Sequence, residues 1–176
     1  MSEHEEVESF IVFDVKLADG DKKWMPERGH VDDAGFDLKV RAIRRISSNP
    51  PPSGGVLGSE EIIDEEGVLM KEEARVLIMT GVFIALRPGW EAQIRPRSGM
   101  ALKAGITITN SPGTIDAGYR NEIGVILQTT TQSHMIKSGD KIAQMVIKRV
   151  PKVYLSMVDE LEDTERGQSG FGSTGA

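Results

Sequence analysis

The sequence contains no cysteine and only three histidines in 176 residues. Disulfide cross-links, thiolate nucleophiles and zinc sites built on cysteine are therefore excluded. The histidines, His4, His30 and His134, fall in no mutual spacing typical of a metal site. Ser–His–Asp chemistry lacks support as well, because the sequence has no nucleophile-elbow motif.

Long hydrophobic runs are also missing. No stretch is apolar for long enough to cross a bilayer, and the opening MSEHEEVESF has no signal-peptide character. We therefore expect a cytoplasmic protein with no membrane partner. Basic residues are outnumbered, with 21 Lys and Arg against 27 Asp and Glu, for a formal net charge of −6. Because general nucleic-acid binders need a basic surface, no nucleic-acid partner is expected.

What is present is an ordinary globular composition, 39% hydrophobic and 27% charged. The length suits one domain, so we predict a single domain over residues 1–176 with a flexible N-terminal tail at 1–9. Residues 46–67 contain three consecutive prolines, which cannot lie in a helix interior or a central strand. We predict a surface loop insertion there, with at most a short strand near Ile62 and Ile63. A tolerated insertion is favoured over a functional loop.

Short apolar runs separated by turn signals dominate the rest of the chain. A strand is predicted first after Phe10, because the period of two is that of a strand. The residues that share one face there are Ile11, Phe13, Val15 and Leu17, which alternate with Val12, Asp14 and Lys16. Only two segments, 98–103 and 157–161, suggest a helix. The pattern predicts an all-β sandwich or jelly roll. Further strands are predicted at 75–86, 91–95, 106–110, 122–130 and 142–150.

The final segment, 163–176, has a different composition. It reads DTERGQSGFGSTGA, and its one large apolar residue is Phe171. Alone, such a segment cannot repay the entropy of its own ordering. It is either a frayed terminus or a mobile lid that becomes ordered on a ligand. In a lid, the Phe171 ring would stack on the ligand and Arg166 would bind an anionic group.

Two aspartates lie in contexts that suit chemistry. Asp37 enters a predicted strand, where a hydrogen bond at the strand end is the simpler interpretation for a lone aspartate. Asp116 lies in a predicted hairpin, Asn110–Arg120, in which Gly113 and Gly118 permit close backbone approach. Open backbone N–H and C=O groups in such a hairpin can bind the edge of a planar base.

Two further segments suit anions. Residues 95–99 combine two arginines, a hydroxyl and a glycine N–H where a strand turns, in the outline of an anion nest. Residues 139–144 turn into a strand in which Gln144 is a donor for a phosphate. Each signal is weak alone, and the residues by themselves indicate only an all-β protein with anion-binding turns.

Together these segments resemble the five ordered motifs of the trimeric dUTPase family. The motifs read AGFDL (34–38), PRSGMA (96–101), NSPGTIDAGYR (110–120), GDKIAQ (139–144) and RGQSGFGSTG (166–175). Five motifs in this order, with fitting spacing from Pro26 onward, are specific. The resemblance implies a jelly-roll-like subunit in a homotrimer, with the C-terminal tail exchanged onto a neighbouring subunit. It also implies hydrolysis of dUTP to dUMP and pyrophosphate, which limits uracil incorporation into DNA and supplies dUMP for dTMP synthesis.

The resemblance also implies a role for each motif. Asp116 holds and helps deprotonate a water that attacks the α-phosphorus, with no covalent intermediate. Asp37 acts through water on the Mg²⁺ that accompanies the triphosphate. The other implied substrate-binding residues are Arg97, Ser98, Gly99 and Gln144 for the phosphates, Asn110, Gly113, Thr114 and Ile115 for uracil, Tyr119 for the deoxyribose, and Arg166, Phe171, Gly172, Ser173 and Thr174 in the lid.

Two positions depart from the family pattern. Asn121 follows Arg120 where glycine is common, and Ser169 replaces a glycine before the aromatic residue of the tail. Neither change removes a residue with an implied chemical role. Two alternatives stay open: a dCTP deaminase on the related fold, and a non-enzymatic role in which the 46–67 loop binds an unidentified protein partner.

Overall fold

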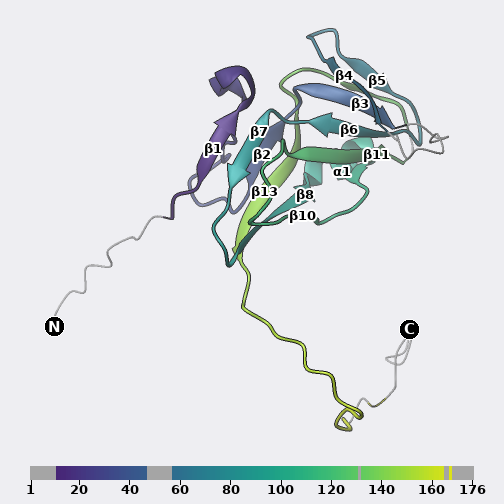
Figure 1. The fold of residues 1–176 in the computed structure, drawn as a ribbon. Coiled ribbons are helices and arrows are strands. Elements are labelled where there is room, and N and C mark those ends of the chain that lie inside the picture. The colour runs from purple at the N-terminus through teal and green to yellow at the C-terminus, as the bar shows by residue number, and fades with distance from the viewer. Residues whose placement is uncertain (1–10, 47–56, 131, 165–166, 168–176) are drawn as a thin grey trace, which may run out of the picture.

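The structure, a computed structural model, describes residues 11–46, 57–130, 132–164 and 167. It is built mainly of short strands, with one α-helix and two 3₁₀ turns (Figure 1). The elements are β1 (Asp14–Leu17), 3₁₀ turns at Ala18–Gly20 and Lys22–Trp24, β2 (Phe36–Lys39), β3 (Ala42–Ile46), β4 (Leu57–Ile62), β5 (Val68–Met70), β6 (Arg75–Met79), β7 (Val82–Ala85), β8 (Trp90–Pro96), α1 (Ser98–Ala104), β9 (Ile106–Ile108), β10 (Gly113–Ile115), β11 (Gly124–Thr129), β12 (His134–Ile136) and β13 (Lys141–Arg149).

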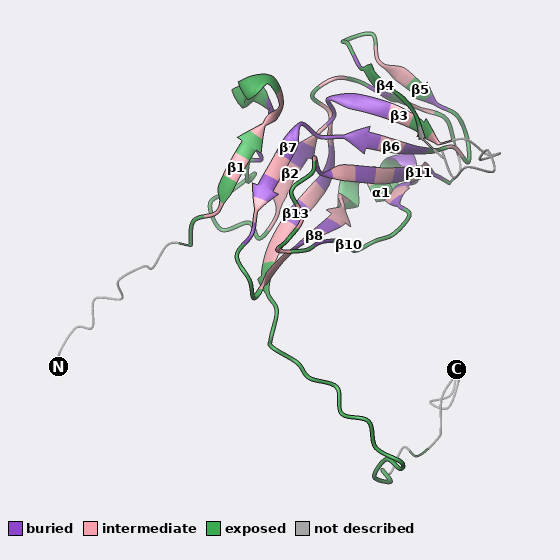
Figure 2. Ribbon diagram, viewed as in Figure 1, coloured by how far each residue is buried: buried purple, intermediate pink, exposed green. Residues whose placement is uncertain are grey.

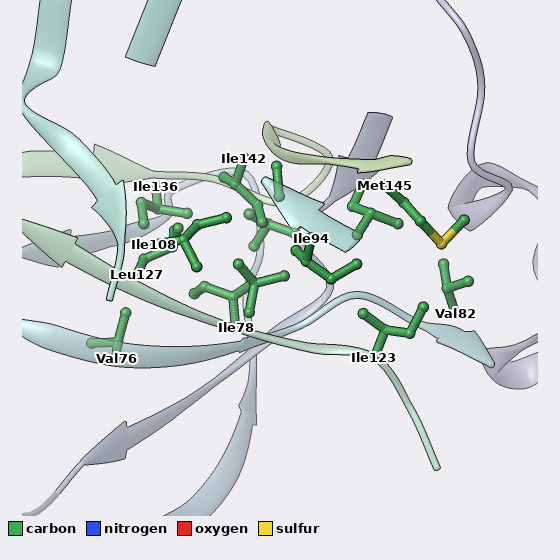
Figure 3. Packing of buried hydrophobic residues seen from close by; sticks show 14 of the residues in the cluster. Val76, Ile78, Val82, Ile94, Ile108, Ile123, Leu127, Ile136, Ile142 and Met145 are labelled. Carbon is green, nitrogen blue, oxygen red and sulfur yellow. The ribbon is translucent and has the colours of Figure 1, made fainter. Parts of the chain in front are cut away.

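Two antiparallel sheets supply most of the core. One has the strand order β4-β3-β6-β11-β9 and the other β10-β8-β13-β2, while β1–β7 and β12–β5 form short pairs. Ile78 and Leu127 of the first sheet belong to one buried cluster with Ile94 and Met145 of the second (Figure 3). The predicted all-β, jelly-roll-like fold is therefore confirmed.

Buried and less buried side chains alternate along the strands, which explains why the sequence pattern predicts them. In β11 every second residue is buried, including Val125, Leu127 and Thr129, as the period of two requires. The predicted strand at 75–86 is wrong as one element, because the chain turns between β6 and β7. Gly81 has φ +76°, and a Cβ there would lie 2.9 Å from the Trp24 ring, so only glycine fits this turn.

Part of the predicted loop at 46–67 is also wrong. Residues 57–62 form β4, an edge strand paired with β3, whereas 47–56 lie outside the described residues. Acidic side chains of β4 make cross-strand ion pairs, such as Glu60 with Arg44 at 3.2 Å. The predicted tail at 1–9 also lies outside the described residues.

Residues 150–164, after β13, leave the body of the molecule as an exposed, non-helical chain (Figures 1 and 2). The predicted helix at 157–161 is therefore wrong. Its apolar residues find no burial within this chain, since Leu155 and Met157 are each 97% exposed. Within the described residues, no helix has the length and apolar character needed to cross a membrane.

Candidate functional site

A polar cleft of about 570 Å³ lies where the chain before β2 meets the start of α1 and β13. It brings together five predicted site residues from three separate motifs. The lining residues are Gly29, His30, Asp33, Ala34, Gly35, Asp37, Arg97, Ser98, Gly99, Met100, Lys103 and Gln144.

Strand order explains how distant motifs meet in this cleft. β13 lies between β8 and β2, and its register places Gln144 opposite Asp37 on one side and Arg95 on the other. The Gln144 amide donates to the Pro96 carbonyl at 2.9 Å, which fixes its side chain at the cleft wall. A Cβ at Gly35 would collide with the Gln144 amide oxygen and lie 3.2 Å from the Gln144 Cβ. Glycine at 35 therefore leaves the space that Gln144 occupies.

Asp37 is the electrostatic centre of the cleft. Its side chain is only 14% exposed, with one oxygen 3.1 Å from Arg97 Nε and the other 2.9 Å from Lys141 Nζ. Arg97 also donates from Nη1 to the Lys141 carbonyl at 2.8 Å. One acid and two cations are thus held at the position where a charged ligand would enter.

The donor set fits a magnesium ion carried by a ligand better than one caged by protein. Within the part of the chain that the structure describes, no group of three or more acidic, histidine or cysteine side chains is placed to hold a metal. Mg²⁺ keeps several waters and commonly uses one or two carboxylates plus substrate phosphates. Asp37 supplies such a carboxylate inside the cleft.

The predicted hairpin forms a second, smaller cavity of about 170 Å³. β9 and β11 pair as its two strands, while β10 crosses from the connection between them to pair with β8 in the other sheet. The hairpin therefore links the two sheets. The lining residues are Ile94, Ile108, Asn110, Gly113, Thr114, Ile115, Tyr119, Gly124 and Val125.

Asp116 and Tyr119 form a tight turn at the end of β10. Asp116 is exposed, and its carbonyl accepts a hydrogen bond from Tyr119 N at 3.0 Å. The half-buried Tyr119 donates its hydroxyl to the Glu122 carbonyl at 2.9 Å. Burial, and then the negative charge of Glu122, raises the pKa of Tyr119, so its hydroxyl stays a donor at neutral pH.

The cleft and the hairpin cavity share no lining residue, and Asp116 lines neither of them. Among the residues that the structure describes, one chain therefore does not bring Asp116 and the phosphate-binding candidates into one cavity. The predicted lid residues Arg166, Phe171, Gly172, Ser173 and Thr174 lie outside the described residues.

Sequence reasoning missed four charged or ionisable residues around the cleft: His30, Asp33, Lys103 and Lys141. Lys103 follows Gly99 by four positions on α1, and this spacing on one helix face was a usable signal. Lys141 stands inside the fourth motif, three residues before Gln144. His30 and Asp33 lie in a turn, where the His30 N–H donates to the Asp33 carboxylate. No sequence pattern indicates that this turn meets α1.

Comparisons with known proteins agree on one family. The sequence model of the dUTPase family matches residues 62–175. The deoxyuridine 5'-triphosphate nucleotidohydrolase of Clostridium kluyveri is 55% identical over 116 residues, which are 65% of this chain and 81% of that protein. The enzyme of the same name from Clostridium tetani is 43% identical over 141 residues, 80% of this chain and 97% of that one.

Solved structures give the same result. A mutant dUTPase of Staphylococcus bacteriophage 80alpha with dUpNHpp has a TM-score of 0.71 at 25% identity, covering 94% of this chain and 99% of that chain. A mutant dUTPase from phage phi11 of S. aureus, described with its coordination of a structural Mg(II) ion, shares the fold. Its TM-score is 0.64 at 22% identity, over 87% of this chain and 100% of that chain.

Proposed function

The chain belongs to the dUTPase family, and we propose that the cleft and the hairpin divide its reaction between them. The enzyme hydrolyses dUTP to dUMP and pyrophosphate with Mg²⁺ as its cofactor. The reaction limits uracil incorporation into DNA and supplies dUMP for dTMP synthesis. The observation that carries the division of roles is the cleft itself, where three sequence motifs surround one cavity of a size suited to a nucleotide's phosphates.

The cleft is proposed to bind the phosphates. Arg97, Ser98, Gly99 and Gln144 present a guanidinium, a hydroxyl, a backbone N–H and an amide to the same space. Asp37 would hold Mg²⁺ through water. When bound, the ion neutralises phosphate charge and fixes the geometry of the triphosphate, which is how an acidic protein accommodates a polyanion.

The hairpin is proposed to bind the nucleoside and supply the base. The Asn110 side chain and the backbone of Gly113, Thr114 and Ile115, which line this cavity, would hydrogen-bond the uracil edge. A hairpin that fits the base closely would exclude the thymine methyl by steric clash. Tyr119 lies under the deoxyribose and leaves no space for a 2′-hydroxyl.

Asp116 carries the chemical step. Its carboxylate positions a water and accepts its proton as the oxygen bonds to the α-phosphorus. The bond from the α-phosphorus to the bridging oxygen breaks, and pyrophosphate leaves. Residues 163–176 are proposed as a lid that closes over the substrate, with Phe171 on uracil and Arg166, Gly172, Ser173 and Thr174 at the γ-phosphate.

A homotrimer with an exchanged tail would complete this site. Two observations support it: the cleft and the hairpin cavity share no residue, and Val153, Leu155, Met157 and Leu161 expose apolar side chains after β13. Exposed apolar residues gathered on one segment are typical of an interface. A single domain over 1–176, a cytoplasmic location and a protein partner for the 46–67 loop remain predictions.

The central test is pyrophosphate release from dUTP, UTP, dTTP and dCTP, with and without Mg²⁺. Asp116→Asn should abolish release from dUTP while calorimetry still detects dUpNHpp binding. Asp14→Asn, an exposed aspartate on β1, is the matched control and should keep parental turnover. Parental turnover by Asp116→Asn would overturn the mechanism, and ammonia release from dCTP would favour the deaminase. An active species that stays monomeric during sedimentation would contradict the shared site.

A further inference from the structure

Glu122 follows the hairpin motif and is held more tightly than a surface glutamate. Its side chain is 10% exposed and accepts three hydrogen bonds. Arg41 donates to both carboxylate oxygens, from Nε at 3.1 Å and from Nη2 at 2.8 Å, and the Gly81 N–H donates at 2.6 Å. A carboxylate satisfied by a two-pronged arginine and a backbone N–H has one defined position.

Arg41 is fixed as firmly as its partner. Its side chain is 9% exposed, and Nη2 also contacts Glu60 at 2.5 Å. Burial alone would lower the pKa of Arg41, but the hydrogen bonds to Glu122 and Glu60 outweigh it and raise the pKa. The guanidinium is therefore a permanent, buried anchor between two acids.

The backbone beside Glu122 is equally constrained. The Ile123 N–H donates to the Val82 carbonyl at 2.8 Å, and the buried Thr80 hydroxyl donates to the Ile123 carbonyl at 2.8 Å. Glu122 is thus held through its side chain, and the peptide that joins it to Ile123 is held through the main chain. Its carbonyl is the one that accepts the Tyr119 hydroxyl.

This arrangement lies behind the wall of the hairpin cavity. Tyr119 and Gly124 line the cavity on either side of Glu122, which itself is not a lining residue. The Tyr119 ring is therefore fixed at its hydroxyl by a carbonyl whose position depends on Arg41. A small movement of that carbonyl would move the ring edge that faces the cavity.

We propose that Glu122 and Arg41 are positioning residues that hold the Tyr119 ring against the sugar, and so set the preference for deoxyribose over ribose. The proposal rests on the sugar-binding role proposed above for Tyr119. A ring can exclude a 2′-hydroxyl sterically only if it cannot move away from the sugar. The Tyr119 ring meets this requirement, because its bond to Cβ fixes one end and the hydrogen bond from its hydroxyl to Glu122 fixes the other. Neither positioning residue needs to touch the nucleotide.

The readout is the ratio of kcat/KM for dUTP to kcat/KM for UTP, measured below the unfolding temperature of every variant. Tyr119→Phe keeps the ring but deletes the hydrogen bond, which is worth about 1 kcal/mol, so the ratio should fall about fivefold. Glu122→Gln and Arg41→Lys should each lower it severalfold, because neither retains the charged two-pronged contact. Glu61→Gln, whose partner Arg45 lies 3.8 Å away on an exposed edge, is the matched control and should leave the ratio unchanged.

A double variant separates positioning from general weakening of the fold. Tyr119→Phe combined with Glu122→Gln should lower the ratio no further than Tyr119→Phe alone, because both changes act through one contact. If Glu122→Gln and Arg41→Lys lower the melting temperature but leave the ratio at the parental value, the positioning role is wrong. Tyr119→Ala tests the premise: a ratio unchanged by Tyr119→Ala would refute the sugar contact itself. A ratio lowered by Tyr119→Ala alone would refute only the role of Glu122 and Arg41.

Discussion

Replacing Arg41 with methionine should destabilise the fold far more than replacing a nearby surface arginine. Arg41 joins β3 and β4 to the hairpin segment through Glu60 and Glu122. Methionine keeps much of the apolar stem but removes every hydrogen bond of the guanidinium. Glu122, which is 10% exposed beside Arg41, would then keep only the Gly81 N–H as a donor.

The size of the loss follows from burial. Removing one partner of a buried ion pair costs about 3–5 kcal/mol, because the other charge is left unpaired. Glu60 is 27% exposed and can recover water, so we expect the lower end, about 3 kcal/mol. For a chain of this length that corresponds to a fall of roughly 6–12 °C in melting temperature. Arg45→Met breaks a pair whose two side chains are 57% and 50% exposed, and should cost under about 1 kcal/mol.

Thermal and urea unfolding at one fixed protein concentration would measure both variants, since an oligomer's melting point depends on concentration. Arg41→Met combined with Glu122→Gln should be more stable than Arg41→Met alone, because it leaves no unpaired buried carboxylate. Equal losses for Arg41→Met and Arg45→Met, or no recovery in the double variant, would refute the reasoning.

Three further predictions concern the cleft and the acid response. Gly35→Ala should raise KM for dUTP about tenfold, because the new methyl group displaces the Gln144 amide. Gly58→Ala is the control, since a Cβ there lies no nearer than 3.4 Å to another atom, and an unchanged KM for Gly35→Ala would argue against a role for Gln144. Burial favours a higher pKa for Glu60, but Arg41 and Arg44 outweigh it and hold the pKa below its ordinary value of 4.5. The stabilisation that the charged Glu60 contributes is therefore fully present above pH 4.5 and is lost as the pH falls below that value. Glu60→Gln should therefore flatten the fall in unfolding free energy below about pH 4.5 in urea titrations. Chelation with EDTA should stop pyrophosphate release, and Asp37→Asn should raise the Mg²⁺ concentration for half-maximal rate about tenfold; an unchanged magnesium curve would remove Asp37 from the metal site.

Strands were predictable where one face is buried. β8 and β11 each turn one face to the core, so Ala92 and Ile94 of β8 and every second residue of β11 are buried. The sequence pattern does not predict β3 and predicts a loop over most of β4, because charged residues such as Arg44 and Glu60 interrupt the apolar alternation. Those charges are cross-strand pairs, and a pair across strands has no local signature in the sequence.

The residues of the candidate site likewise divide into those that the sequence predicts and those that only the fold brings together. The motifs singled out Asp37, Arg97 and Gln144, and the structure brings their side chains to one cleft. Asp33 was missed, since nothing local marks a turn aspartate as a cleft residue. Lys141 stands in the fourth motif, but the sequence does not indicate that it pairs with Asp37. Only the tertiary structure shows that the cleft and the hairpin cavity are separate, and which residues line each.

The sequence by itself determined the all-β class, the turn positions and the ordered motifs that identify the family. These properties depend on side-chain period and on local backbone chemistry, which neighbours along the chain dictate. The tertiary structure alone decided that β13 separates β2 from β8, that Asp37 meets Lys141, and that Arg41 meets Glu122 across 81 residues. Such contacts follow from strand order and burial, because a charge is fixed only by the partners that folding brings to it.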